Sequence, residues 1–246
     1  AGGDGGGSEP TDYTTTNVQE EGVDEIDIVK TDGTYIYAAQ DQAFHIVDSW
    51  PVEEAHKLSS LELDGWIRGM FLHEDTVLVF ANVYGEDSEV FSNWSGTRMT
   101  VIDVTDRSAP VIERTIDVDG YLADGRMIDG DVYAVMNHWM YFPQEAWDIL
   151  YDEDLELPDV DYWSLPEDER DAALEVAREE ARAILEPLVH ALALSMDLDT
   201  VLPVWRDQVT GEDDAEVEGM HACSDLYRPA DVSRLNVLSL VNLDLN

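Results

Sequence analysis

Short runs in which apolar and polar residues alternate recur along the chain, and many of them meet at an acidic turn. Residues 28–37 predict a strand, a tight turn at Asp32-Gly33 and a second strand, because glycine tolerates the positive φ angle of a hairpin turn. The same layout recurs at residues 70–79 and 126–135. Alternation with a period of two is typical of strands that bury one face, so the pattern predicts repeated antiparallel hairpins.

A second set of elements extends each hairpin to four strands. Residues 44–48 match residues 99–103, and a further alternating run precedes each of the Asp-Gly pairs at 64–65 and 119–120. Four short strands in roughly 40–45 residues are the signature of a β-propeller blade. We therefore predict an all-β fold, a partial β-propeller with about three four-stranded antiparallel blades.

One hairpin is enlarged in blades two and three. We assign residues 27–64 to blade one and residues 68–119 to blade two, in which residues 83–97 widen the hairpin between the second and third strands. Blade three begins at Gly125, and its third strand is expected only near residues 235–241. A long insertion therefore lies at the corresponding hairpin of blade three.

The insertion has the pattern of a helix. Residues 168–186 are rich in Ala, Glu, Arg and Leu with apolar side chains at helical spacing, and Pro187 is expected to kink or end the helix. We expect this α-helical insertion in the third blade to decorate the propeller without forming an enzyme domain. The predicted organisation is a flexible Gly-rich tether at 1–16, blades one, two and the start of three at 17–137, a mainly helical insertion at 138–222, and a truncated return to blade three at 223–246.

The order of strands predicts which end of the blades carries a site. In a four-stranded meander, the second-to-third hairpin and the connection to the next blade emerge on the same side. Both enlarged hairpins and both Asp-Gly connections should therefore share one rim, where loops concentrate function, although insertions also collect where they do no harm. Exposed aromatic side chains stack on sugars or partner proteins, but they also pin long loops. The candidate ligand-binding residues on this rim are Trp66, Trp94, Tyr121 and Trp139.

The chain is strongly acidic, with 55 acidic and 13 basic residues and a formal net charge of -42. Nucleic acid is excluded as a partner, because phosphate binding needs basic patches. The charge fits a solvated surface, adaptation to high salt, where the Debye length is about 3 Å near 1 M, or scattered cation binding. No run of eighteen apolar residues is present, so no transmembrane segment is predicted.

Candidate metal ligands are few. His221, Cys223 and Asp225 lie close together in the sequence, but no partner motif completes a zinc site, so a structural loop is favoured. Calcium prefers about six to eight oxygen ligands, and residues 152–161 form an acidic loop, although its spacing is not that of an EF-hand and a solvated loop is favoured. No cofactor other than calcium is a candidate, and no catalytic residue is predicted. The calcium candidates are Asp152, Asp154, Asp159 and Asp161.

Residues 16–33, TNVQEEGVDEIDIVKTDG, are similar to the opening of a secreted bacterial and archaeal β-propeller domain family that is distantly related to WD-type propellers. Residues 125–128, GRMI, and residues 223–229, CSDLYRP, resemble internal segments of the same family. The resemblance spans most of the chain after residue 16 and corresponds to the N-terminal part of the domain. It implies a propeller fold, but the family is uncharacterised and brings no catalytic residue with it.

These observations favour a non-catalytic exported propeller that binds a protein or polysaccharide through the rim, or that serves as a surface scaffold. The alternative is a hydrolase or lyase that uses rim carboxylates on a glycan-type substrate, since glycosidases need two carboxylates about 5–10 Å apart. The Gly-rich residues 1–8 fit a tether behind an export signal or a lipidated cysteine, or else a fragment end. We expect an extracellular or surface-anchored protein.

Closure of the propeller is the remaining question. A propeller needs about 4–8 blades to close, and the chain ends inside the predicted third blade. We expect either a fragment of a longer protein or self-association through open blade edges, because exposed strand edges pair with other chains.

Overall fold

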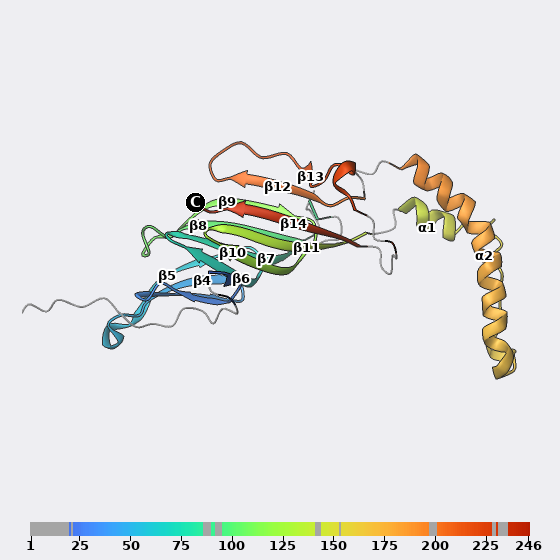
Figure 1. Ribbon diagram of the computed structural model, residues 1–246, viewed down its shortest axis with the longest axis horizontal. Coiled ribbons are helices and arrows are strands. Elements are labelled where there is room, and N and C mark those ends of the chain that lie inside the picture. Colours follow the sequence, from blue (N-terminus) through green and yellow to red (C-terminus); the bar gives the residue numbers. More distant parts are fainter. Residues whose placement is uncertain are drawn as a thin grey trace, which may run out of the picture. The chain divides into compact units, whose positions relative to one another are not determined.

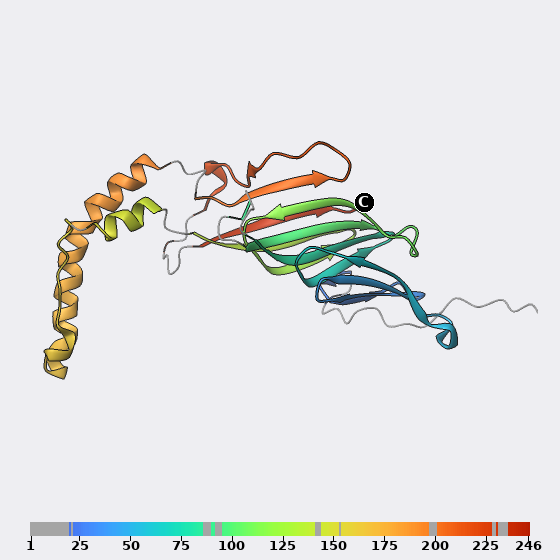
Figure 2. The same cartoon turned by 180° about the vertical axis from the view of Figure 1, so that it is seen from behind.

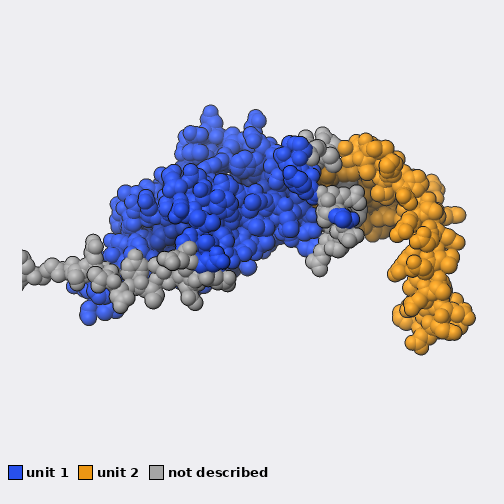
Figure 3. All heavy atoms as spheres, viewed as in Figure 1, with its two compact units in different colours: residues 1–139, 203–246 blue, residues 140–202 orange. Residues whose placement is uncertain are grey.

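The computed structural model divides into two units, which we describe separately: residues 1–139 with 203–246 form unit 1, and Met140–Leu202 form unit 2 (Figure 3). The structure describes residues 20, 22–85, 90–91, 95–140, 144–152, 154–196, 201–227, 230 and 236–246.

Unit 1 is built from three antiparallel sheets that correspond to the three predicted blades (Figure 1). The sheets are open, which confirms the prediction of a partial propeller. Blade one contains β2 (Val29–Thr31), β3 (Tyr35–Gln40), β4 (Ala43–Asp48) and β5 (His56–Glu62), with a short 3-10 helix η1 (Val52–Glu54) before β5. Blade two contains β6 (Trp66–His73), β7 (Thr76–Tyr84), β8 (Ser95–Asp103) and β9 (Val111–Val118). Blade three contains β10 (Tyr121–Ile128), β11 (Asp131–Trp139) and β14 (Asn236–Asp244).

Blade two is buried on both faces, because alternate residues of its strands face opposite neighbours. Val77 and Val79 of β7 join a core cluster with blade one. Leu78 and Phe80 join a second cluster with blade three. Side chains of a strand alternate between its faces, so a central blade reads as a nearly continuous apolar run.

Residues 24–27 lie along the first strands of blades two and three. The short strand β1 (Asp24–Glu25) pairs with β10, and Asp27 bridges to Met70 of β6. Lys30 anchors this segment. Its side chain is 3% exposed, and its Nζ donates to Asp24 Oδ1 and Oδ2 at 2.8 and 2.9 Å and to the carbonyl of Glu25. A buried lysine is stable only when it is paired in this way.

The chain returns from unit 2 to blade two before it completes blade three. Strand β12 (Val204–Val209) pairs with β9 from Trp205↔Val118 to Val209↔Arg114. Strand β13 (Glu218–Gly219) pairs with β12, and a 3-10 helix η4 (Cys223–Asp225) follows. The sheet of blade two therefore has six strands. Figure 2 shows the orange strand β12 beside the green strands of this unit. The segment that the sequence assigns to a mainly helical insertion thus ends in two strands of the propeller.

Unit 2 is helical, as the spacing of its apolar residues predicts. It contains α1 (Gln144–Leu150), a 3-10 helix η2 (Tyr162–Ser164) and α2 (Glu167–Ser195). Helix α2 continues through Pro187 and does not end there. Arg170 fastens its first turn, because Nε donates to the carbonyls of Tyr162 and Leu165 at 3.1 Å. Among the described helices, none is long and apolar enough to cross a membrane.

Candidate functional site

Strand register places the rim aromatics at one end of unit 1. Trp66 begins β6, Tyr121 begins β10, and Trp139 ends β11 opposite Asn236 of β14. All three therefore lie at the end of the blades that carries the second-to-third hairpins, as the strand order predicts. Trp94 lies outside the described residues.

A hollow of about 310 Å³ opens on this rim between blades one and two. The indole of Trp66 is 51% exposed, and the side chain of Tyr84, at the end of β7, is 61% exposed. The hollow thus offers two large aromatic side chains beside polar groups. Its lining residues are Gln42, Asp64, Gly65, Trp66, Val83, Tyr84 and Arg98.

The backbone around Trp66 is fixed by two neighbours. Gly65 has φ +94°, and a Cβ at this position would lie 2.5 Å from the carbonyl oxygen of Asn82, so only glycine fits against β7. The N–H of Ile67 donates to the carbonyl of Asp41 at 2.8 Å, which joins the connection to the β3–β4 turn of blade one. The hollow is therefore preformed by the packing of two blades.

Arg98 is the positively charged residue that lines the hollow. Its Nε and Nη2 donate to Asp117 at 2.6 and 2.9 Å, and its Nη1 donates to Asp64 at 2.8 Å. Arg206 of β12 also donates to Asp117, whose side chain is buried. The hydrogen bond to Asp117 raises the pKa of Arg98 further above its ordinary value. The guanidinium is a permanent cation whose charge the two carboxylates balance, so the site carries no excess of positive charge.

Side-chain contacts join blade two to blade three at this rim. The hydroxyl of Tyr121 is hydrogen-bonded to Ser95 Oγ. His138 Nδ1 lies 3.2 Å from Asp119 Oδ2, and both side chains are almost fully buried. These contacts pin the start of blade three to blade two. Of the three predicted site residues that the structure describes, Trp66 lines the hollow, whereas Tyr121 and Trp139 do not.

Two of the candidate calcium ligands bind nearby groups of unit 2. In unit 2, Asp152 accepts the N–H of Asp154 at 2.9 Å and Asp161 accepts the hydroxyl of Ser164 at 2.5 Å. Among the residues that the structure describes, no group of three or more His, Cys, Asp or Glu side chains could hold a metal ion. Calcium binding by the acidic loop, with Asp159 as a further ligand, stays a prediction.

A comparison with protein families identifies the fold. The model of the β-propeller domain matches residues 13–246. The chain belongs to the β-propeller domain family. This confirms the resemblance seen in its opening motif, and it explains why repeated hairpins stack face to face in unit 1.

Two archaeal relatives of this β-propeller domain are uncharacterized proteins. One, from Methanocaldococcus jannaschii, is 27% identical over 129 residues, which cover 52% of this chain and 18% of the relative. The other, from Archaeoglobus fulgidus, is 27% identical over 147 residues, which cover 54% of this chain and 20% of the relative. The propeller thus matches only about a fifth of the length of each relative. No solved structure matches.

Sequence reasoning missed three members of the hollow in this propeller: Gln42, Tyr84 and Arg98. Gln42 lies in a turn of blade one, and its position beside Trp66 depends on how two blades pack. The sequence does indicate that Tyr84 lies on the rim, because this residue ends an apolar strand where an enlarged hairpin begins. The Arg98–Asp117 pair also had a weak signal, since both residues interrupt apolar runs in neighbouring strands.

Proposed function

We propose that this β-propeller domain is a non-catalytic, exported binding module whose rim hollow takes a neutral polysaccharide. The observation that carries the proposal is the pair of exposed aromatic side chains, Trp66 and Tyr84, that line a hollow together with hydrogen-bonding groups. Aromatic faces bury the C–H surface of a sugar ring. The Gln42 amide and the Asp64 carboxylate also line the hollow and would bond its hydroxyls.

The volume of the hollow and the charge of the domain restrict the class of ligand. The volume of about 310 Å³ is at the lower end of ligand sites, which corresponds to one sugar unit of a longer chain. With a net charge of -42, the domain repels polyanions at moderate salt. Arg98 offers them little compensation, because Asp64 and Asp117 already bind it. A neutral glycan therefore fits better than an acidic one.

The pairing of the rim carboxylates supports a role in binding over hydrolysis. Glycosidases need one carboxyl group that gives a proton and a second one that acts as base or nucleophile. Here Asp64 and Asp117 both bind Arg98, and Asp119 pairs with His138. An extracellular, surface-anchored location is part of the proposal. It rests on the tether-like composition of residues 1–8.

The test is titration calorimetry with a panel of soluble neutral polysaccharides. Trp66→Ala is expected to weaken binding at least about tenfold, as the loss of a central aromatic contact does. The matched control is Trp50→Ala, which removes another half-exposed indole at the opposite end of blade one. Equal binding by the two variants, or no binding by the wild type, would overturn the assignment of the hollow. Release of reducing ends from a bound polysaccharide would overturn its non-catalytic part.

A further inference from the structure

We propose that the Asp64–Arg98 ion pair in the rim hollow binds two hydroxyl groups on adjacent carbons of one sugar ring, and that Arg206 of β12 is a positioning residue for this pair. Such a ligand is a narrower class of the neutral polysaccharides in the proposed function, on which this assignment rests. Asp64 and Arg98 both line the hollow, as do the aromatic residues Trp66 and Tyr84. Blades one and two, between which the hollow opens, each have all four of their strands.

The Asp64 carboxylate has one oxygen that the protein holds and one that is open to a ligand. Oδ2 accepts a hydrogen bond from Arg98 Nη1 at 2.8 Å. Oδ1 has no hydrogen-bond or ion-pair partner in the part of the chain that the structure describes. The Asp64 side chain is 80% exposed, so a ligand can reach this oxygen. Because the bond from Arg98 restricts rotation of the carboxylate, Oδ1 is a preorganised acceptor.

Arg98 supplies a donor next to this acceptor. Its Nη1 carries two N–H groups, and the bond to Asp64 uses one of them. Among the described residues, no second acceptor bonds Nη1. An acceptor oxygen and a donor N–H therefore lie side by side in the lining of the hollow. Hydroxyls on adjacent carbons match this pair, since one can donate to Asp64 Oδ1 while the other accepts from Arg98 Nη1.

The orientation of Arg98 is fixed from its other side by Asp117. The Asp117 side chain is only 3% exposed, and its two oxygens accept bonds from Arg98 Nε and Nη2 at 2.6 and 2.9 Å. Such a two-bond fork sets the plane of a guanidinium group. Arg206 Nη2 also donates to Asp117, at 2.9 Å from Oδ2, and so holds this carboxylate in turn. Strand β12 therefore supports the hollow through Arg206, although this residue is not part of the lining.

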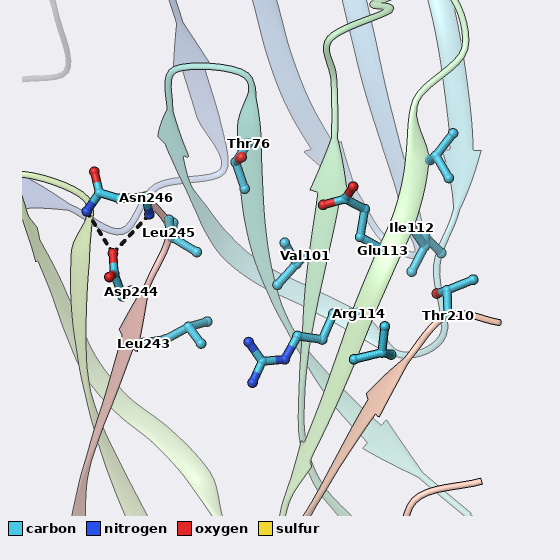
Figure 4. Close-up of a pocket in the computed structure, with 12 residues that line it drawn as sticks. Thr76, Val101, Ile112, Glu113, Arg114, Thr210, Leu243, Asp244, Leu245 and Asn246 are labelled. Carbon is cyan, nitrogen blue, oxygen red and sulfur yellow. Dashed lines mark hydrogen bonds between the residues drawn. The ribbon is translucent and has the colours of Figure 1, made fainter. Parts of the chain in front are cut away.

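A second arginine–aspartate pair joins β12 to β9 on the opposite face of the same sheet. Arg114 Nε donates to Asp207 Oδ1 at 2.6 Å. Successive side chains of a strand point to opposite faces, so Asp207 and its neighbour Arg206 lie on opposite faces of β12. Arg114 lines a different hollow, together with Leu243 of β14 (Figure 4). Arg114→Gln therefore loosens β12 without a change in the rim hollow, and it is the matched control for Arg206→Gln.

The ligand test compares neutral polysaccharides by titration calorimetry. Dextran and a soluble galactomannan carry free adjacent hydroxyls in different orientations, whereas the 1,3-linked sugar units of laminarin carry none. The better ligand of the first two is expected to bind at least about tenfold more tightly than laminarin, because hydrogen-bonding groups left without a partner are costly. Oxidation of that polysaccharide with periodate and reduction with borohydride opens the rings between adjacent hydroxyls and keeps the polymer neutral. It should weaken binding to the same extent.

The protein test uses variants of both ends of the network. Asp64→Ala removes an exposed carboxylate and should weaken binding of the better ligand at least about tenfold. Arg206→Gln should weaken it by about threefold to tenfold, because Arg98 loses its fixed orientation. Arg206→Lys keeps a donor for Asp117 and should restore most of this loss. Arg114→Gln should bind as the wild type does.

The ion pair is overturned as the hydroxyl-binding group if laminarin binds as tightly as the better ligand, or if Asp64→Ala binds as the wild type does. Equal affinities of Arg206→Gln and Arg114→Gln overturn the positioning role. If Trp66→Ala still weakens binding in these cases, the polysaccharide site stands and only the assignment of adjacent hydroxyls falls. A wild type that binds none of the three polymers removes both proposals.

Discussion

Replacing Lys30 with methionine is expected to lower the free energy of unfolding of the propeller by about 3 kcal/mol. The change removes both bonds to Asp24 and the bond to the Glu25 carbonyl. Breaking a buried ion pair from one side costs about 3–5 kcal/mol, because the other charge stays buried without a partner. The Asp24 side chain keeps 24% exposure and regains some hydration, which places the cost at the lower end. Methionine retains a stem of similar length against the ring of Phe71.

The assay is urea unfolding followed by tryptophan fluorescence in a double-mutant cycle. Asp24→Asn supplies the second single variant, and the coupling energy between positions 24 and 30 should be about 1–3 kcal/mol. Because the pair is buried, the coupling should persist in about 2 M NaCl, where exposed pairs are screened. Lys57→Met is the matched control, since Lys57 is the only other lysine of the chain and is exposed on β5. Equal losses for the two lysine variants, or a coupling energy near zero, would refute the reasoning.

Three further predictions concern the rim, alkaline pH and salt. Gly65→Ala should destabilise by about 2 kcal/mol or more, because of its positive φ and the close approach of the Asn82 carbonyl. Gly85→Ala should not destabilise in this way, because no atom of the described residues lies within 4 Å of a Cβ at this position, and similar urea midpoints for the two variants would contradict this. Burial, followed by the hydrogen bond to Asp32, raises the pKa of Tyr37. Because the folded state holds the proton of the Tyr37 hydroxyl more tightly than the unfolded state does, this group contributes to stability in full below the unfolded pKa of about 10. The contribution is lost as the pH rises above that value. Thermal melts from pH 8 to 11 should therefore fall less steeply for Tyr37→Phe, and parallel curves would refute the assignment. Because the net charge of -42 repels itself, the melting temperature should rise between about 0.1 and 2 M NaCl, and a flat or falling curve would exclude adaptation to high salt.

The blades could be predicted because their signals are local. Alternation over a few residues and a turn acid followed by glycine specify a hairpin without knowledge of the rest of the chain. The pairing of β12 with β9 could not be predicted in this way. Its partner lies far away in the sequence, and the run Val204–Val209 alone does not say which edge it covers. Of the residues that line the hollow, only Trp66 was predicted as a ligand-binding residue. The contribution of Gln42 could not be predicted, because it depends on how two blades pack.

Local rules left two outcomes open for the helix at Pro187. Proline removes a hydrogen bond and usually kinks or ends a helix, and of these two outcomes the structure excludes the end, because α2 runs through Pro187 to Ser195. Its apolar residues fall at helical spacing on both sides of the proline. Continuity of that pattern was the better guide to the length of the helix.

The route of the chain through β11, β12 and β14 affects how the domain folds and how far the length of its helical segment can vary. The pair Trp139↔Asn236 closes a loop that contains all of unit 2. The entropy of closing a loop grows only with the logarithm of its length, so an increase from about ten to about a hundred residues costs about 2 kcal/mol. The helical segment can therefore lengthen, shorten or be exchanged at small cost to the blades. During synthesis, however, the edge of β11 that β14 covers has to wait until the whole helical segment has left the ribosome, and that edge stays unpaired by β14 for that time.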